Sequence, residues 1–197
     1  MFWATGPIYQ VPDSQVAGNI VKPTLRVVDT AYTYPLFNSS EYGDMITDMS
    51  SDSPRNTLIL DNLKNYPTQQ IVLLCHRKEH VHILHAAIPG SVMLLSTPDM
   101  NKKERVQVIK ALEAGTARIV VTTFGLFHKG IDLDTLEVMF LCAPTRSKVR
   151  IKQCAGRIMR TSTRIVNKSP IIVDFVDKKV DLLKFQFYAR NRVLQNL

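Results

Sequence analysis

Two arginines three residues apart are the side chains of this sequence best suited to phosphate chemistry. Arg157 and Arg160 follow Gly156 in the segment IKQCAGRIMR, residues 151–160, and Gln153 precedes them. A planar guanidinium can donate two hydrogen bonds to one phosphate, which an ammonium group cannot do. Residues three apart share one side of a helix, so the pair could reach one ligand. A solvated basic helix face would give the same pattern, and both interpretations stay open here.

The distribution of charge places these arginines in a basic part of the chain. The net charge is +8, and residues 144–197 hold 13 Lys/Arg against three Asp/Glu. Residues 1–143 hold 12 Lys/Arg and 14 Asp/Glu, so the whole excess lies in the last quarter. Such asymmetry suggests a polyanionic partner, either nucleic acid or the phosphates of a nucleotide. A basic C-terminal helix that only solubilises the protein would give the same distribution, and both interpretations stay open.

Length and composition predict one ordinary globular domain. The chain has 197 residues, 45% hydrophobic and 21% charged, which is normal for a soluble protein. No apolar run approaches the roughly 18 residues that would span a bilayer, and no signal peptide is recognisable. The three cysteines are far apart and odd in number, so we expect no disulfide framework and a reducing, intracellular setting.

Apolar runs alternating with amphipathic segments predict an α/β fold. Strand-like runs occupy residues 24–30, 70–75, 91–96, 117–123, 136–142 and 169–175. Helices are expected near 42–49, from Pro54, and over 79–88, 102–115, 148–160 and 178–195. Apolar strands without polar alternation are typical of a doubly wound, mainly parallel sheet with helices on both faces. We expect residues 1–54 to form a linker segment with one strand, and residues 55–197 to form the α/β domain.

Polar residues follow several of the expected strands, where open parallel sheets bind ligands. A cation follows the strand at 70–75, and hydroxyls follow the strands at 91–96 and 117–121. The last of these strands leads into TTFGLFHKGIDLD, which we expect to be a long polar loop. Small hydroxyls and backbone amides suit contact with a sugar-phosphate backbone. The candidate residues are Arg77, Ser96, Thr97, Thr122, Thr123, Gly130 and Asp132.

Two motifs in the right order carry a resemblance to a known family. RIVVTT followed by KGIDLD is similar to motif V of superfamily 2 helicases, and QCAGRIMR fits the Gln-x-x-Gly-Arg-x-x-Arg pattern of motif VI. IVLLCHRKEHVHIL resembles motif IV. The chain as a whole resembles the second RecA-like domain of a DEAD/DEAH-box helicase. Its N-terminal part is similar to the branch that holds type III restriction subunits and xeroderma pigmentosum B-like repair helicases.

The resemblance implies roles for individual residues in ATP hydrolysis. Gln153 would lie near the nucleotide, Arg157 and Arg160 would face the γ-phosphate with Arg160 as the arginine finger, and Gly156 would permit close approach. Gly130 and Asp132 would lie at the domain interface, with Asp132 near the ribose.

The same resemblance implies that nucleic acid, DNA in preference to RNA, is bound through strand-end residues. Thr122 or Thr123 would touch nucleic-acid phosphate, with Arg77 nearby and Ser96 and Thr97 offering their hydroxyls.

The sequence lacks two parts that a complete motor needs. It contains neither a G-x-x-x-x-G-K-[ST] loop nor an Asp-Glu pair of the acidic metal-holding box. The first residues resemble sequence that follows motif III, so we expect the chain to begin at the boundary between two RecA-like domains. We also expect ATP with Mg²⁺ to be held mainly by the other domain, and the 197-residue chain alone to be inactive.

Two other interpretations compete with the motor domain. Cys75, His76, His80, His82 and His85 crowd a short segment, and histidine-rich tracts bind metals. However, His80 and His82 point to different sides of a helix, and no zinc-finger spacing occurs, so we predict no metal site. A stand-alone nucleic-acid-binding module could keep the fold without motor activity. Such a module has no use for arginines directed at a γ-phosphate, so motif VI favours the motor domain.

Overall fold

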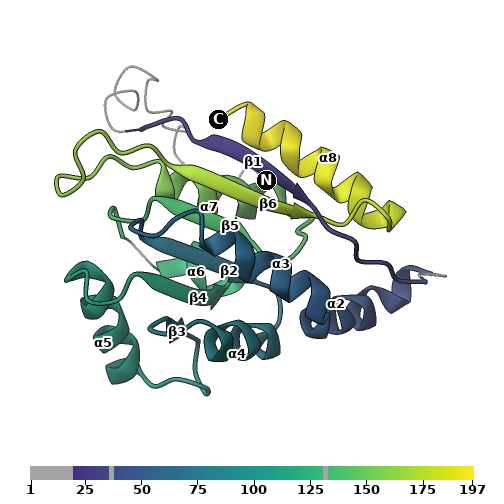
Figure 1. Ribbon diagram of the computed structural model, residues 1–197, viewed down its shortest axis with the longest axis horizontal. Helices are drawn as coiled ribbons and strands as arrows, with labels where there is room; N and C mark the ends of the chain where they lie inside the picture. Colours follow the sequence, from purple (N-terminus) through teal and green to yellow (C-terminus); the bar gives the residue numbers. More distant parts are fainter. Residues whose placement is uncertain (1–19, 36–37, 131–132) are drawn as a thin grey trace, which may run out of the picture.

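Strands of three to six residues, most of them apolar, form one parallel sheet in the computed structural model, which describes residues 20–35, 38–130 and 133–197. The strand order is β1-β6-β5-β2-β4-β3, and every neighbouring pair is parallel. The predicted doubly wound α/β fold is therefore confirmed (Figure 1). The strands are β1 (Thr24–Asp29), β2 (Ile71–Cys75), β3 (Val92–Leu94), β4 (Ile119–Thr123), β5 (Val138–Leu141) and β6 (Ile171–Val176).

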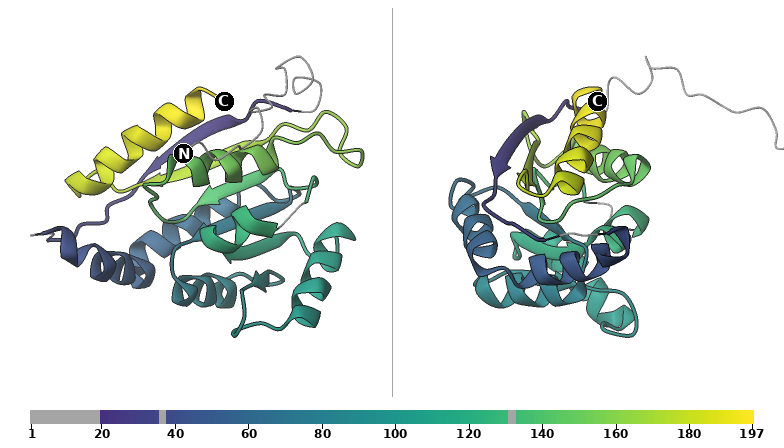
Figure 2. Two further views of the ribbon diagram at one scale, coloured as in Figure 1. Left: turned by 180° about the vertical axis from the view of Figure 1, so that it is seen from behind. Right: turned by 90° about the vertical axis from the view of Figure 1, so that its right-hand side faces the viewer.

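Helices cover both faces of this sheet. One apolar cluster joins β2, β4 and β5 to α5, α6 and α7, and a second joins the opposite face to α3 and α4. The right-hand view of Figure 2 shows the helices on two sides of the sheet. The helices are η2 (Ser39–Glu41), α2 (Tyr42–Ser51), α3 (Ser53–Leu63), α4 (Lys78–Ala87), α5 (Lys102–Glu113), α6 (Phe124–Gly130), α7 (Lys148–Ile158) and α8 (Asp181–Gln195).

Strand β2 shows why the strands lack polar alternation. All five of its residues are buried, and successive side chains of a strand point to opposite faces. Val72 and Leu74 therefore join the cluster beneath α6 and α7, while Ile71 and Leu73 join the cluster beneath α3 and α4. A central parallel strand buried on both faces is therefore apolar at nearly every position.

The structure corrects two of the expected elements. Residues 124–130, expected as part of a polar loop, form helix α6, because Phe124 and Phe127 are spaced by three and both bury their rings. The helix expected over 148–160 ends at Ile158, so Arg160 lies beyond it and pairs through its backbone with Ile20.

The strand at residues 24–29 is the edge of the same sheet rather than a separate unit. β1 pairs with β6 along its whole length, from Thr24 beside Ile171 to Asp29 beside Val176. Helix α2 then packs Met45, Ile46 and Met49 against residues at the start of α8. The division of the chain at residue 54 stays a prediction, and the described residues before it pack on the sheet.

Candidate nucleotide and nucleic-acid interface

Helix α7 separates its residues into a buried side and an open side. Ser147 caps its start by accepting a hydrogen bond from the Arg150 amide at 3.1 Å. Gln153 is exposed, and Arg157 is partly exposed with its Cζ atom 6.0 Å from the centre of the Phe127 ring. The buried side, which fixes the rotation of the helix, consists of Ile151, Cys154, Ala155 and Ile158.

Gly156 lies on the open side of the same helix. A Cβ atom built at this position would meet no atom of the described chain within 4 Å. Packing within the chain therefore does not require glycine here. The open surface beside Gln153 and Arg157 leaves room for an external group to approach the helix backbone.

Arg160 follows the end of α7 and is held through its main chain. The Val21 amide donates to the Met159 carbonyl at 2.7 Å, and the neighbouring bridge joins Ile20 to Arg160. The Arg160 side chain is exposed. Its position thus depends on the backbone of the segment before β1 as well as on the helix.

Lys168 ties the segment carrying Arg160 to the chain that follows α6. Its Nζ atom donates to the Arg160 carbonyl at 2.9 Å and to the Asp134 carbonyl at 2.7 Å. The residue is only 6% exposed, and burial lowers the pKa of Lys168 to about 8, against the opposing effect of Asp134 and Glu137. The ends of the two predicted helicase motifs are therefore joined by one buried side chain.

The other predicted nucleotide ligands are at the end of α6 and in the segment that follows it. Gly130 is the last residue of α6, and Asp132 lies outside the described residues. Because α6 starts at the carboxyl end of β4 and runs for seven residues, Gly130 lies about 10 Å along the helix from that strand end. Gly130, expected within a long polar loop after this strand, instead ends a helix.

The predicted nucleic-acid ligands gather at the carboxyl edge of the sheet. Arg77 follows β2, Thr123 ends β4, and Ser96 and Thr97 follow β3, with both of these last two residues exposed. These three strands are neighbours in the order β2-β4-β3. The hydroxyl of Thr97 accepts a hydrogen bond from Arg105 Nη1 at 3.1 Å.

The two threonines of β4 have different surroundings. Thr122 is fully buried, and its hydroxyl donates to the Leu94 carbonyl at 2.8 Å. Thr123 is partly exposed and accepts from the Leu126 amide at 3.3 Å, at the start of α6. Thr122 therefore serves the pairing of β4 with β3, and only Thr123 remains a candidate contact.

The nucleotide and nucleic-acid candidates occupy different parts of the domain. Helix α7 begins at the carboxyl end of β5 and leads back to the amino end of β6. Arg160 consequently lies toward the opposite edge from Arg77, Ser96 and Thr123. The structure does not bring the two sets together into one pocket.

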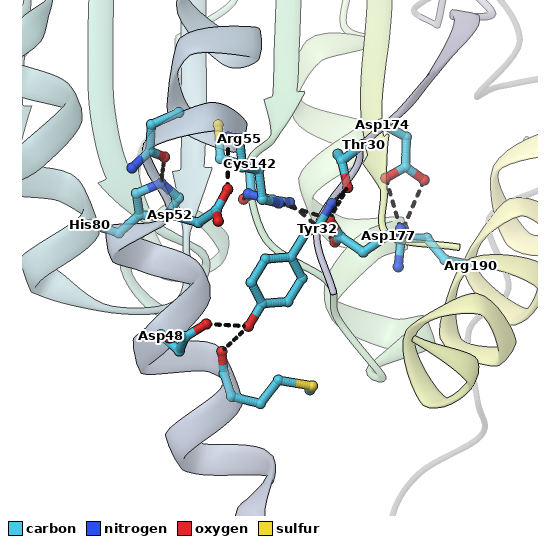
Figure 3. Close-up of polar contacts among 12 residues, drawn as sticks. Thr30, Tyr32, Asp48, Asp52, Arg55, His80, Cys142, Asp174, Asp177 and Arg190 are labelled. Carbon is cyan, nitrogen blue, oxygen red and sulfur yellow. Dashed lines mark hydrogen bonds and ion pairs between the residues drawn. The ribbon is translucent and has the colours of Figure 1, made fainter. Parts of the chain in front are cut away.

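Sequence reasoning missed a set of buried ion pairs at the carboxyl edge (Figure 3). Arg55 is 2% exposed, and its Nε and Nη2 atoms donate to Asp177 at 2.8 and 3.3 Å. Its Nη1 atom donates to the Cys142 carbonyl at 2.6 Å, and the Thr30 hydroxyl also donates to Asp177. The only signal in the sequence was an aspartate directly after an apolar strand.

A second buried pair joins β6 to α8. Arg190 donates to both oxygens of Asp174 at 2.8 Å. Burial raises the pKa of Asp174, and the Arg190 charge limits the rise. Tyr32 forms a related contact by donating to Asp48 at 2.8 Å, and burial raises the pKa of its phenol. Arg190 therefore ties helix α8 to the sheet, and Tyr32 ties the segment after β1 to helix α2.

The histidine-rich segment does not form a metal cluster in the described chain. His80 is 1% exposed and its Nε2 atom lies 2.9 Å from Asn56 Oδ1, while His82 is exposed. Burial lowers the pKa of His80 to about 3, so the ring is neutral. Among residues 20–35, 38–130 and 133–197, no three His, Cys, Asp or Glu side chains are grouped to hold an ion. No helix in these ranges is long and apolar enough to cross a membrane.

Comparison with curated proteins places the chain beside viral transcription proteins. Transcript termination protein A18 of cowpox virus (strain Brighton Red) is 24% identical over 155 residues, covering 68% of this chain. The match covers 31% of the viral protein, so the chain spans about a third of the length of this relative.

Solved structures share the fold. Dbp5 of S. cerevisiae, bound to RNA and ADP BeF3, has a TM-score of 0.66 at 12% identity, covering 90% of this chain and 41% of Dbp5. The C-terminal domain of the DEAD-box protein Dbp5 has a TM-score of 0.62 at 14% identity, covering 89% and 84% of the two chains. The sheet is therefore that of a RecA-like helicase C-terminal domain.

A sequence family accounts for the central part of the chain. Residues 55–162 match the helicase conserved C-terminal domain family, from the start of α3 through both predicted motifs. The match covers more than half of the residues. The chain belongs to the helicase conserved C-terminal domain family.

Proposed function

We propose that the chain is the second motor domain of an ATP-dependent nucleic-acid helicase or translocase. The observation that carries this proposal is the open side of α7 and the turn after it, where Gln153, Arg157 and Arg160 follow the motif VI spacing. A domain that only bound nucleic acid would need no phosphate-directed arginines on the side away from the strand-end residues.

In this proposal, ATP with Mg²⁺ is held mainly by a first RecA-like domain in cis or in trans. Guanidinium groups suit the oxygens of a γ-phosphate, so the donor set of α7 fits this ligand. Arg160 is the proposed arginine finger, and Arg157 is the second phosphate contact. Such a finger accelerates related phosphoryl transfers by roughly 10³ to 10⁵. Gln153 and Gly156 border the nucleotide from the same helix.

The loop after α6 would contact the remainder of the nucleotide. Gly130 and Asp132 are proposed at the domain interface, with Asp132 near the ribose. Lys168 joins the end of this loop, through the Asp134 carbonyl, to the Arg160 carbonyl. A movement of either backbone segment would therefore displace the other through Lys168.

Nucleic acid is proposed to cross the carboxyl edge of the sheet. Arg77, Ser96, Thr97 and Thr123 would contact its sugar-phosphate backbone without reading sequence. DNA is favoured over RNA by the resemblance to restriction subunits and repair helicases. Dbp5 was solved with RNA, and A18 carries the name of a transcript termination protein, so both polymers are compared in the test.

We place the chain in superfamily 2, in the branch of type III restriction subunits and xeroderma pigmentosum B-like helicases. An intracellular location follows from this function, and it would be cytoplasmic in a prokaryote or phage. The 197-residue chain alone is proposed to be inactive, because the phosphate-cradling loop and the acidic box do not occur in its sequence.

The alternative is a stand-alone nucleic-acid-binding module. ATP hydrolysis is measured on the chain alone, on a first RecA-like domain alone, and on their mixture, each with and without DNA or RNA. The proposal expects stimulated hydrolysis only in the mixture. If the chain binds nucleic acid but the mixture shows no stimulated ATP hydrolysis, the stand-alone binding module is supported. ATP hydrolysis by the chain alone would contradict the proposal that the first domain holds ATP.

A further inference from the structure

Three arginines and a glutamine surround one tyrosine at the carboxyl edge of the sheet. We call Tyr42, Arg77, Arg146, Gln186 and Arg190 the Tyr42 cluster. Its members come from α2, the turn after β2, the turn after β5, and helix α8. Four separate segments therefore meet at the edge where parallel sheets bind their ligands.

Short contacts tie the cluster together around Tyr42. The Cζ atom of Arg146 lies 4.9 Å from the centre of the Tyr42 ring, and the Tyr42 hydroxyl donates to Gln186 Oε1 at 3.4 Å. Arg77 Nη2 donates to the Gly43 carbonyl at 2.8 Å, directly beside Tyr42 in sequence.

Electrostatic effects show that Arg190 belongs to the same group. Burial raises the pKa of Tyr42, and the positive charges of Arg146, Arg190 and Arg77 oppose that rise. Arg190 is anchored on its other side by the two bonds to Asp174. Figure 3 shows this pair at the end of β6, with Arg190 extending from α8.

Three hydrogen-bond donors of the cluster have no acceptor. Arg77 Nε, Gln186 Nε2 and Arg190 Nη1 are buried and have no partner among the described residues. Gln186 and Arg190 are only 6% and 3% exposed. A buried donor without an acceptor is costly, so native proteins rarely leave several in one place.

Two neighbouring side chains also carry buried atoms without partners, His76 Nε2 and Asn191 Oδ1. A neutral histidine nitrogen can donate or accept, and the two ends of an asparagine amide can exchange. Burial lowers the pKa of His76; a hydrogen bond to the Pro144 backbone opposes this effect, and the charges of Arg150, Arg77 and Arg190 add to it. Of the five buried side-chain atoms without partners among the described residues, three are therefore donors, and all three belong to the Tyr42 cluster.

The charge of the cluster exceeds what the protein compensates. Asp174 neutralises Arg190, whereas Arg77 and Arg146 have no ion-pair partner among the described residues. Two positive charges and three free donors thus point to an anion with several acceptor oxygens. A phosphate group offers such oxygens in several directions, whereas a carboxylate has only two in one plane.

Much of the cluster lies outside the part of the chain that matches the helicase family. That match covers residues 55–162, while Tyr42 lies before it and Gln186 and Arg190 lie after it. Three of the five cluster residues therefore lie outside the matched family segment, while Arg77 and Arg146 lie within it.

We propose that the Tyr42 cluster binds a phosphate group between α2, α8 and the turns after β2 and β5. Arg77, Gln186 and Arg190 donate to its oxygens from the protein side, and Arg146 closes over it from the exposed side. The phosphate belongs either to a nucleic-acid strand or to a small free phosphate compound. The first source rests on the proposed function and extends its strand path beyond Arg77.

The test is calorimetric titration of the 197-residue chain in chloride buffer. The probes are inorganic phosphate, pyrophosphate and a twelve-residue oligothymidylate. The central variant is Arg146→Gln, because Arg146 is exposed and its loss leaves the core intact. The matched control is Arg164→Gln, another exposed arginine, whose guanidinium donates to the Glu113 carbonyl at the end of α5.

We expect Arg146→Gln to weaken binding about tenfold or more, as for loss of a charge-assisted hydrogen bond, and Arg164→Gln to bind as wild type. If Arg146→Gln binds phosphate and pyrophosphate more weakly than Arg164→Gln does, the site is assigned to small phosphates. If the two variants differ only in their affinity for the oligonucleotide, the site is assigned to a nucleic-acid strand. The Tyr42 ring signals in NMR spectra should shift with the same probe. Equal binding by both variants for every probe would overturn the proposal.

The same variants separate this inference from the proposed function. If Arg146→Gln loses binding but no ATP hydrolysis appears with a first RecA-like domain, the phosphate site stands and the motor proposal fails. If hydrolysis appears and the two variants bind all probes equally, the motor proposal stands and the phosphate site is wrong.

Discussion

Replacing Arg55 by methionine should destabilise this domain more than any exposed substitution. The change removes three hydrogen bonds, two to Asp177 and one to the Cys142 carbonyl. Asp177 is 1% exposed and, among the described residues, its side chain would keep only the Thr30 hydroxyl as a donor. Removing one partner of a buried ion pair costs about 3–5 kcal/mol, because the other charge stays buried without compensation.

The loss should be measured by urea denaturation, with a thermal melt as a second readout. For a domain of this size, each 1 kcal/mol lowers Tm by about 2–4 °C, so Arg55→Met should lower it by roughly 6–20 °C. The matched control is Lys64→Met, which removes an ion pair of 2.7 Å whose side chains are 78% and 56% exposed. That variant should stay within about 0.5 kcal/mol of wild type.

A double-mutant cycle separates the ion pair from general damage to the core. Asp177→Asn alone leaves the Arg55 charge buried, whereas Arg55→Met with Asp177→Asn leaves no charge. The double variant should therefore be less destabilised than the sum of the single variants by more than about 1 kcal/mol. Additive losses would refute the reasoning, because they would mean that the two side chains do not interact energetically.

Three further substitutions test single features. His80→Gln keeps a donor for Asn56 but removes a ring whose pKa falls from 6.5 to about 3 on folding. Because the unfolded chain binds the proton at higher pH than the folded chain, the wild-type free energy of unfolding should fall by up to about 1.4 kcal/mol per pH unit below pH 6.5. Urea titrations at several pH values should show a smaller fall for the variant. Lys168→Met should destabilise at pH 7 by leaving the Asp134 and Arg160 carbonyls without their donor. Because the folded pKa of Lys168 is about 8 against 10.5 unfolded, wild type should also gain stability over the variant between pH 8 and 10.5. Gly156→Ala should stabilise the chain by up to about 1 kcal/mol through helix propensity, yet lower ATP hydrolysis in the mixture with a first domain.

Each of these outcomes has a clear contrary result. If the free energy of unfolding of His80→Gln falls as steeply below pH 6.5 as that of wild type, the proton is taken up by another group. A wild-type advantage over Lys168→Met that does not change from pH 8 to 10.5 would mean that the amine has its ordinary pKa. Unchanged hydrolysis in Gly156→Ala would show that nothing approaches that side of α7.

The centre of the sheet could be predicted because strands such as β2 and β5 are buried on both faces. An apolar run such as residues 71–75 has few alternatives once helices flank it. Helix α6 could not be predicted, because Gly125 and the polar residues after Phe127 are typical of a loop and outweigh the helical spacing of its two buried rings. The helical pattern is too short to separate from a loop without the packing against β4.

The candidate site was predictable only where it is local in sequence. The spacing of Gln153, Arg157 and Arg160 lies within eight residues, so a motif can be read directly. Arg55 and Asp177 are 122 residues apart, and no local pattern connects them. The separation of Arg160 from the strand-end residues likewise depends on α7 running back across the sheet.

The most direct test of the motor proposal is single-turnover ATP hydrolysis by the chain mixed with a first RecA-like domain and nucleic acid. The comparison is Arg160→Lys against Arg164→Lys, because each substitution keeps the positive charge and removes the planar guanidinium group. We predict that Arg160→Lys lowers the rate by about 10³ or more while Arg164→Lys retains the wild-type rate. Equal rates for the two variants would contradict the assignment of Arg160 to the γ-phosphate.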